Sequence, residues 1–397
     1  MPPGYLRADG RKGIRNIVAV AYLVECAHHV ARRIVQPYAD QGAQLIGFPG
    51  CYPNDHAHRI MEQICTHPNV GAVLLVSLGC ESFSRQALFE TIEASGRPLR
   101  TLVIQESGGT LKSIETGRAW VEQAMETIKT VERVPFAPAD LIVGSICGGS
   151  DATSGIAANP AIGLVSDRLV AEGGTSIFEE TGELIGCEQH MAGRAVTPAL
   201  GRELVASVEK AKRYHEIMQH GSFAPGNAEG ELTTQEEKSL GAYCKSGSGP
   251  IHGLLKPGDR PPRSGLYLLD VVPDGEVRFG FPNINDNAEI TELIACGAHL
   301  ILFATGRGSV VGSAISPVIK ITGNTETFFR MRDDMDINAG AFILGDASLE
   351  AIRDEIFDRM LAVIEGEMTC SEALGHQEFA LVYKSFEPLG PSCLPGG

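Results

Sequence analysis

The turn-rich stretch GFPGCYPNDHAH, residues 47 to 58, carries several side chains that can bind a metal ion. Cys51 supplies a thiol and His56 an imidazole, and both groups are suitable ligands for borderline divalent ions. Alternatively, Asn54 or Asp55 caps a helix that starts here, which would place the two histidines of the stretch on different faces. The residue types alone leave both interpretations open.

A second candidate for chemistry is the acidic segment FEETGELIGCEQHM, residues 178 to 191. In a helix, Glu180 and Glu183 would lie side by side because they are three residues apart. Such a pair could hold a divalent cation, or one carboxylate could act as a general base whose pKa is raised by its neighbour. For any single glutamate, a solvated helix start is the alternative. A further acidic run around Asp334 resembles an oxygen-ligand cluster but lacks the spacing of an EF-hand.

Two glycine-rich segments could hold an anionic group on backbone N–H donors, because a helix is predicted after each of them. One is ESGGT, with Gly108 and Gly109, and the other is CGGSDATSG, with Cys147 and Asp151. Neither segment matches a Walker loop or a GxGxxG fingerprint, so nothing in them favours nucleotide binding.

Short apolar runs predict the strands that would position these residues, since such runs between turn residues are typical of buried parallel strands. The runs lie at 17–23, 44–48, 72–78, 101–105, 141–146, 175–180, 264–272 and 299–306. Amphipathic spacing predicts helices at 25–35, 55–65 and 113–131, with more helical sequence around 200–220. The fold class predicted is therefore α/β, with Rossmann-like parallel sheets.

The chain length predicts more than one unit, because 397 residues are too many for a single comfortable core. PFAPAD, at 135–140, has the composition of a linker. We therefore expect two or three α/β units, with boundaries at 1–134, 139–260 and 261–397.

Polar residues and glycines follow most of the predicted strands. In open parallel sheets, ligands bind at the carboxyl ends of the strands, so this recurrence predicts one site assembled from several loops. The residues that follow strands in this way include Cys51, Cys80, Glu81, Gly108, Gly109, Cys147, Asp151, Glu180 and Arg307.

The composition excludes some partners. A formal charge of −16, from 33 basic and 49 acidic residues, would repel nucleic acid and anionic lipid. No apolar run approaches the roughly 20 residues that a membrane-spanning helix needs, so no membrane role is expected. The ten cysteines are scattered singly without a CxxC pair, and the start of the chain lacks a cleavage pattern. We therefore expect free thiols and a cytoplasmic protein.

The sequence contains a series of ordered blocks, from DGRKGIRN near its start to DDMDINAG at 333–340. Together these blocks resemble the large domain of the altronate and galactarate dehydratase family. The resemblance runs from about residue 4 to nearly the end of the chain. It implies a lyase that removes the proton α to a carboxylate and expels a group from the β carbon, with a divalent metal, expected to be iron, as Lewis acid. The blocks include DGRKGIRN, VIQESGGT, CGGSDATSGIAANPAIG, EETGELIGCE, PGNAEGELTTQEEKSLG, FATGRGSVVGSAISPVIKITGN and DDMDINAG.

Within that family, two features resemble the large β subunits of (2R)-sulfolactate sulfo-lyases. The chain begins almost at DGRKGIRN, where the dehydratases carry a small extra domain first, so a separate small (α) subunit and an oligomer are expected. FPGCYPND, with Cys51, replaces the loop found after the second strand in the dehydratases. The resemblance implies β-elimination of sulfite from sulfolactate to give pyruvate. The alternative is a sugar-acid dehydratase that converts altronate or galactarate to a 2-keto-3-deoxy acid.

The resemblance also implies roles for individual residues. We assign Cys51, Cys80, Glu81 and Cys147 to the metal, with Glu183 beside them. Glu180 or His56 is expected to move the proton, and Glu183 and Asp151 complete the catalytic set. The anionic end of the substrate is expected to meet a group of basic and glycine residues, namely Arg15, Gly108, Gly109, Arg307 and Lys320.

Two further readings stay open at this point. The cysteines could hold an iron–sulfur cluster, as in some other dehydratases. The chain could also be a non-catalytic scaffold for a catalytic partner, although the concentration of Cys, Glu and Gly after its strands argues against that reading.

Overall fold

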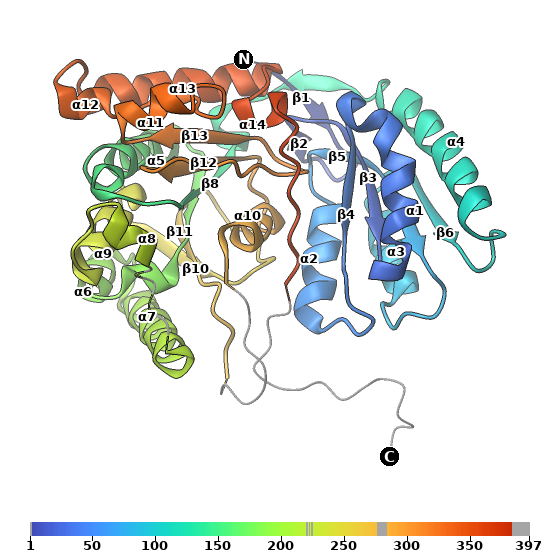
Figure 1. Cartoon of the computed structure of the whole chain (residues 1–397), viewed down its shortest axis with the longest axis horizontal. Coiled ribbons are helices and arrows are strands. Elements are labelled where there is room, and N and C mark those ends of the chain that lie inside the picture. The colour runs from blue at the N-terminus through green and yellow to red at the C-terminus, as the bar shows by residue number, and fades with distance from the viewer. Residues whose placement is uncertain (1, 220, 222, 224, 276–283, 383–397) are drawn as a thin grey trace.

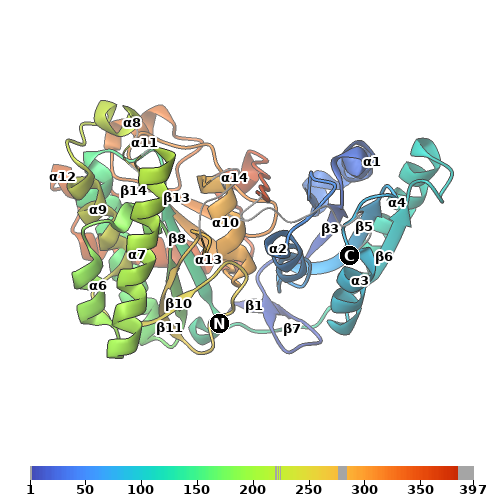
Figure 2. The same cartoon turned by 90° about the horizontal axis from the view of Figure 1, so that it is seen from below.

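The computed structural model describes residues 2–219, 221, 223, 225–275 and 284–382. The chain forms two α/β lobes that lie side by side (Figures 1 and 2). Each lobe is built on its own parallel sheet, of four strands in the first lobe and seven in the second. This confirms the predicted fold class.

The first lobe is a four-stranded parallel sheet with helices on both faces. Its strands lie in the order β4-β3-β5-β6, and β5 is buried along its whole length, as expected for a central parallel strand. Helices α1 and α4 cover one face, and α2 and α3 cover the other. The strands are β3 (Ile17–Tyr22), β4 (Ala43–Gly47), β5 (Val70–Ser77) and β6 (Leu99–Val103). The helices are α1 (Glu25–Val35), α2 (Asp55–Cys65), α3 (Arg85–Ala94) and α4 (Thr110–Ile128), with a 3-10 turn η1 (Gln36–Gln41) after α1.

The chain's single tryptophan, Trp120, lies in α4 and is half-buried against the apolar core between α1, α4 and the sheet of this first lobe.

The second lobe is a seven-stranded sheet in the order β10-β11-β9-β8-β12-β13-β14, in which every neighbouring pair is parallel. Strands from the second and third predicted units share this sheet, and β10 pairs with β11 directly across the predicted boundary at 260. The two stretches therefore form one lobe. The strands are β8 (Ile142–Cys147), β9 (Thr175–Phe178), β10 (Ile251–Leu255), β11 (Gly265–Leu269), β12 (Leu300–Thr305), β13 (Val318–Thr322) and β14 (Ile337–Asn338).

Helices cover both faces of the second sheet. Helices α5 and α13 pack on one face, whereas α10 packs on the other and also contacts α2 of the first lobe through a shared apolar core. The helices are α5 (Asn159–Ala171), α6 (Glu188–Arg194), α7 (Pro198–Met218), α8 (Pro225–Glu229), α9 (Gln235–Tyr243), α10 (Asp286–Ala295), α11 (Thr325–Arg330), α12 (Ala341–Leu344), α13 (Leu349–Glu365) and α14 (Cys370–Ala373). Shorter turns are η2 (Pro138–Asp140), the π-helical η3 (Ser154–Ala158), η4 (Thr181–Leu184) and η5 (Cys244–Ser246).

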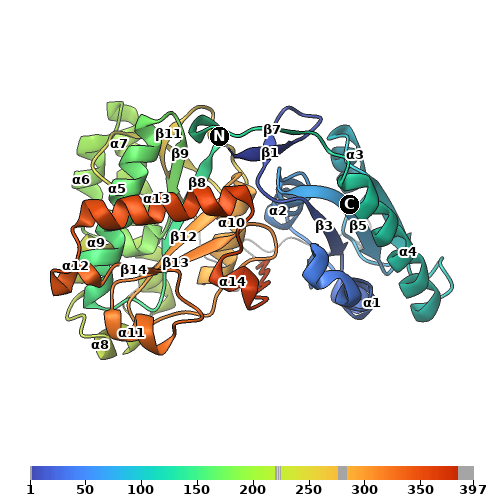
Figure 3. The ribbon, with the colours of Figure 1, turned by 90° about the horizontal axis from the view of Figure 1, so that it is seen from above.

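A small antiparallel sheet, in the order β2-β1-β7, lies between the lobes (Figure 3). It pairs the start of the chain, by hydrogen bonds, with the segment that leaves the first lobe. The strands are β1 (Pro3–Leu6), β2 (Lys12–Gly13) and β7 (Arg133–Pro135). Within the described ranges, no helix is both long and apolar enough to cross a bilayer.

Candidate functional site

The ends of two adjacent strands bring a thiol and a carboxylate together. Cys147 is the last residue of β8, and Glu180 lies two residues after the end of β9, which pairs with β8. The Cys147 backbone N–H donates to Glu180 Oε1 at 3.0 Å, and the Cys147 thiol donates to Glu180 Oε2 at 2.9 Å. Because the strands are parallel, both groups lie at the carboxyl edge of the sheet, where the strand-end pattern predicts a site.

Glu183 completes a three-residue cluster, which we call the acid–thiol cluster: Cys147, Glu180 and Glu183. The turn η4 carries Glu183 back toward the strand ends, so that its Oε2 lies 3.6 Å from Cys147 Sγ. One ligand atom from each of the three residues lies within 4.8 Å of the others. Within the described residues, this is the group of Cys, His, Asp and Glu side chains with the spacing of a metal site.

Two buried lysines neutralise the two carboxylates of the cluster. Lys245, in η5, is fully buried, forms an ion pair with Glu180 and donates to Cys147 Sγ at 3.2 Å. Lys238, in α9, forms an ion pair with Glu183. With the thiol protonated, two carboxylates and two ammonium groups cancel, as burial requires. Metal binding at this position would therefore have to displace positive charge that the chain itself supplies.

Burial and these charges shift the pKa values around the cluster. Burial raises the pKa of Cys147, although Lys245 acts in the opposite direction. Burial alone would lower the pKa of Lys238, but the Glu183 carboxylate outweighs it and the pKa is raised. At the start of α10, burial and then the nearby Glu183 charge raise the pKa of Asp286 to about 6. A β carbon on Gly148 would lie 2.0 Å from Asp286 Oδ2, so only a glycine lets this carboxyl group approach the strand end.

The backbone at Glu180 is strained in a way that sets the direction of its side chain. Its φ of 93° lies in the left-handed region, which residues other than glycine adopt rarely. Such a conformation costs about 1–3 kcal/mol and persists where the surroundings over-determine it, as at active sites. Here the ion pair with Lys245 and the hydrogen bonds from Cys147 supply that constraint.

Asp151 lies beside the cluster, but its side chain forms hydrogen bonds within its own loop. Its Oδ1 accepts hydrogen bonds from the Thr153 hydroxyl, at 2.5 Å, and from the Ser154 backbone N–H, at 3.1 Å. A cavity of about 10 Å³, the size of a single water molecule, is bounded by Cys147, Asp151 and Lys238 among other residues. Asp151 also lines a polar cavity of about 340 Å³, which Arg307 lines too. Asp151 thus lies between the cluster and an open polar pocket.

The predicted basic residues have structural partners. Arg307 donates to the Gly226 carbonyl at 2.6 Å and pairs with Glu229. Arg15 makes a two-pronged ion pair with Glu372, at 2.7 and 2.9 Å, which connects the start of the chain to α14. Lys320 is fully buried in the middle of β13, where burial lowers its pKa. Of the three, Arg307 lies on a pocket next to the acid–thiol cluster.

The first lobe holds the remaining predicted ligands, and the structure does not bring them to the acid–thiol cluster. Cys51 and Cys80 are exposed. Glu81 instead accepts hydrogen bonds from the Ser77 hydroxyl and, at 2.9 Å, from the Gly79 backbone N–H. Of the four residues assigned to the metal, only Cys147 belongs to the described group with metal-site spacing.

The other predicted residues of this lobe also lie outside the cluster. His56 Nε2 lies 3.3 Å from Glu292 Oε1, across the contact between α2 and α10. Gly108 and Gly109, both with positive φ, lead into α4, and the Gly109 N–H donates to the Ile104 carbonyl. Of the two residues expected to move the proton, Glu180 belongs to the acid–thiol cluster and His56 does not.

The lysines of the site were missed by reasoning from the sequence. Lys238 stands within PGNAEGELTTQEEKSLG, a block that resembles the dehydratase family, so a signal for it existed. Lys245 follows that block and carries no local pattern that marks it as buried.

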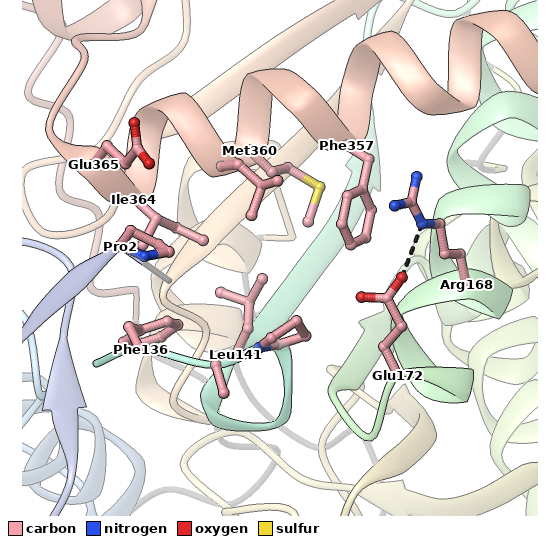
Figure 4. Close-up of a pocket in the computed structure, with 12 residues that line it drawn as sticks. Pro2, Phe136, Leu141, Arg168, Glu172, Phe357, Met360, Ile364 and Glu365 are labelled. Atoms are coloured by element: carbon pink, nitrogen blue, oxygen red, sulfur yellow. Dashed lines mark hydrogen bonds and ion pairs between the residues drawn. The ribbon is translucent and has the colours of Figure 1, made fainter. Parts of the chain in front are cut away.

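A separate apolar cavity lies away from this chemistry. It has a volume of about 360 Å³ and lies between α13 and the segment that leads into β8 (Figure 4). Phe357, Met360 and Leu141 line it, and the Arg168–Glu172 ion pair lies at its edge. Because Leu141 immediately precedes β8, the cavity lies at the amino end of that strand, whereas the acid–thiol cluster lies at the carboxyl end.

Two family models match the chain, one over the first lobe and one over the second. Residues 4–129 match the second domain of D-galactarate dehydratase/altronate hydrolase, and residues 138–386 match the C-terminal domain of D-galactarate/altronate dehydratase. The first match ends at residue 129 and the second begins at residue 138.

Individual relatives agree with these models. The chain is 31% identical to altronate dehydratase from Escherichia coli, over 96% of this chain and 77% of the relative. It is 30% identical to (2R)-sulfolactate sulfo-lyase subunit beta from Chromohalobacter salexigens, over 95% of this chain and 96% of the relative. It is also 30% identical to galactarate dehydratase from E. coli, over 95% of this chain and 76% of the relative. The chain therefore belongs to the galactarate/altronate dehydratase family.

Proposed function

We propose that this protein is a lyase that removes the proton α to the carboxylate of a 2-hydroxy acid and expels a leaving group from the β carbon. The observation that carries the proposal is the acid–thiol cluster, in which Cys147, Glu180 and Glu183 meet at the carboxyl edge of the larger sheet. The family membership supports the reaction class, because the relatives named above are dehydratases and a sulfo-lyase.

The donor set of the cluster fits a divalent metal ion, which we expect to be Fe(II). One thiol and two carboxylates are suitable ligands for such an ion, and both carboxylates already bind a positive charge in the form of a lysine. When bound, the metal would supply Lewis-acid polarisation of the substrate carboxylate and 2-hydroxyl. An iron–sulfur cluster fits less well, because such clusters need several cysteines and the acid–thiol cluster contains one.

The side chains of the chain itself would then move the proton and hold the charge. In this proposal the Glu180 carboxylate accepts the proton from C2 of the substrate. The Lys245 and Lys238 ammonium groups, buried beside the carboxylates, stabilise the negative charge that develops on the substrate carboxylate as the proton leaves. Burial strengthens both effects because the local dielectric is low.

We propose (2R)-sulfolactate as the substrate. Loss of the C2 proton and of sulfite from C3 forms a C2–C3 double bond, and the resulting enolpyruvate tautomerises to pyruvate. The similarity to a sulfo-lyase subunit, which extends over nearly the whole of both chains, supports this choice. Since that relative is named as a subunit, we also propose that this protein acts with a separate small subunit in the cytoplasm.

The second candidate is a sugar acid. The same step with hydroxide as the leaving group converts altronate or galactarate to a 2-keto-3-deoxy acid, and three of the relatives carry dehydratase names. The polar cavity beside Asp151, with a volume of about 340 Å³, favours this candidate because it has room for a polyhydroxylated chain.

A parallel assay separates the two candidates. The protein is incubated with a sulfo-lyase small subunit and Fe(II) in the absence of oxygen, and sulfite release from (2R)-sulfolactate is measured beside keto-deoxy acid formation from altronate and galactarate. Sulfite with equimolar pyruvate supports the sulfo-lyase, whereas keto-deoxy acid supports a dehydratase. If no substrate reacts while the protein is folded and metal-loaded, the substrate assignment is wrong.

A further inference from the structure

Four arginines converge at the joint between the lobes, at the carboxyl end of α2. Arg11 and Arg97 both donate to the Thr66 carbonyl, at 2.5 and 2.8 Å, and Arg260 lies 3.4 Å from the Thr66 hydroxyl. Arg7 donates to the buried carbonyl of Pro68, two residues further on, at 2.6 Å. The arginines come from the β1–β2 turn, the α3–β6 connection and the segment after β10, so both lobes and the sheet between them contribute. We call these four residues the arginine cluster.

The arginine cluster carries more positive charge than its surroundings cancel. Among the ion pairs of the described residues, these guanidinium groups have one carboxylate partner, Asp9, which lies 2.6 Å from Arg11 and 3.6 Å from Arg97. The carbonyl groups satisfy hydrogen bonds without adding net charge, and the end of α2 contributes about half a negative charge. Four positive charges therefore face about one and a half negative charges, in a protein whose net charge is −16.

The pKa values of two members of the cluster and of the nearby His67 are lowered. Burial, followed by the charge of Arg97, lowers the pKa of Arg7 to about 9. Burial lowers the pKa of Arg97 to about 10, and Arg11 and Arg260 act in the same direction. Burial lowers the pKa of His67 well below its usual value, and His299, Arg11 and Arg97 act in the same direction.

The arrangement has a buried floor and an accessible rim. Arg97 is only 7% exposed, and its Nη1 is buried without a hydrogen-bond partner. Arg260 and Asp9 are exposed, and Arg11 is partly exposed. Asp9 lies on a tight turn in which Gly10 has a φ of 82°, so its carboxylate reaches the floor from the solvent side.

We propose that Arg11, Arg97 and Arg260 form a binding site for a small oxyanion such as inorganic phosphate or sulfate, and that the Asp9 carboxylate occupies its place when no anion is bound. Planar guanidinium groups bind tetrahedral oxyanions through paired charge-assisted hydrogen bonds. Nη1 of Arg97, which faces the Asp9 carboxylate at 3.6 Å without a hydrogen bond, supplies a donor at the floor. A bound oxyanion would connect the first lobe, the small antiparallel sheet and the second lobe. The site shares no residue with the acid–thiol cluster, so this proposal does not depend on the proposed reaction.

The test is a calorimetric titration of the whole protein with inorganic phosphate, in buffers of constant ionic strength adjusted with chloride. Two variants should change affinity in opposite directions. Arg260→Gln removes a rim donor and should weaken phosphate binding about tenfold or more. Asp9→Asn removes the competing carboxylate and should strengthen it. Arg59→Gln is the matched control, because Arg59 lies on α2 but pairs with Asp259 instead, and it should leave the affinity unchanged.

A purely structural arginine cluster predicts a different pattern. In that case phosphate would not bind the wild-type protein above the level of the chloride control, or Asp9→Asn would weaken binding or leave it unchanged. Either result overturns the proposal. Repeating the titration with sulfate and with acetate distinguishes the class of ligand: sulfate should replace phosphate, and acetate should bind more weakly because it offers fewer oxygen acceptors.

Discussion

The backbone conformation of Glu180 sets the direction of the carboxylate that we propose as the base. Its backbone lies in the left-handed region, and its carboxylate contacts both the Cys147 thiol and Lys245. The side chain is therefore held before any substrate arrives. Pre-organisation of this kind is what a base and metal ligand require.

Replacing Glu180 with glutamine should abolish turnover while the protein stays folded, because the amide is isosteric but cannot accept the proton. We expect a loss of activity of at least about 100-fold, typical of a missing general base. Mn(II) affinity, measured by calorimetry without oxygen, should fall as well, since one anionic ligand is lost.

The matched control is Glu188→Gln, from the same acidic segment. Glu188 accepts a hydrogen bond from the Gly186 backbone N–H and lies outside the acid–thiol cluster, so activity should stay near that of the wild type. Unchanged turnover in Glu180→Gln would remove Glu180 from the mechanism.

His299 should make stability depend on pH. Its Nδ1 accepts from the Ile142 backbone N–H at 3.1 Å and its Nε2 contacts the Lys12 carbonyl at 2.9 Å, so the neutral ring is fully used. Burial lowers its pKa from 6.5 to about 4. Between these values the unfolded chain binds a proton that the folded chain does not, so stability present above pH 6.5 is lost as the pH falls through about 4.

The variant His299→Gln tests this, because glutamine keeps one donor and one acceptor but does not titrate. Urea unfolding from pH 7 to pH 4 should show a smaller loss of stability in the variant than in the wild type. The difference between the two proteins should be about 3 kcal/mol over this range, from the pKa change of His299. The exposed His29→Gln is the control, and equal slopes in all three proteins would contradict the assignment.

At the residue scale, the sequence predicted part of the site. Cys147 and Glu180 could be predicted because they stand at the ends of apolar runs, and Glu183 because it lies in an unusually acidic segment. The two lysines could not, since their burial depends on α9 and η5 folding back over the strand ends. Cys51 and Cys80 also follow strands, but those strands belong to the four-stranded sheet of the first lobe. The position of a residue after a strand does not indicate which sheet that strand joins.

Helix α5 positions the turn that carries Lys245. The two elements pack so closely that a β carbon on Gly163 would lie 2.1 Å from the Cys244 carbonyl oxygen. The position of Lys245 therefore depends on the absence of a side chain at Gly163 in α5.

Gly163→Ala should thus push η5 away from the acid–thiol cluster. We expect a loss of about 1–3 kcal/mol in unfolding free energy, as for other overpacked cores, together with a fall in kcat. Urea unfolding and steady-state kinetics measure the two effects. In the control Gly193→Ala, the new β carbon in α6 meets no atom within 4 Å, so stability should hold or rise slightly. Wild-type kcat in Gly163→Ala would show that η5 does not position Lys245.

The elements most easily predicted are those with strong periodicity. Helices α1 and α2 begin and end at the predicted residues, since both are amphipathic and flanked by turn residues. Strand β13, VIKIT, lacks an unbroken apolar run because the buried Lys320 interrupts it. Strands β1, β2, β7 and β14 have two to four residues each, which is too short for any period to show.

At the scale of the whole molecule, the predicted linker at 135–140 separates two lobes, but the predicted boundary at 260 does not. Strand order explains the difference. In the larger sheet β8 lies between β9 and β12, so segments far apart in the sequence are neighbours. Apolar runs in the sequence indicate that strands exist but not the order of the strands in a sheet. The sequence therefore could not distinguish a single sheet of seven strands from two smaller sheets.

The lone tryptophan makes the two lobes optically distinguishable. Because Trp120 lies in α4, its emission reports on the packing of the first lobe, whereas far-ultraviolet circular dichroism averages over the helices of both. Comparing denaturation curves from the two signals would show whether the lobes lose structure together. The apolar core shared by α2 and α10 is one physical link between the two transitions.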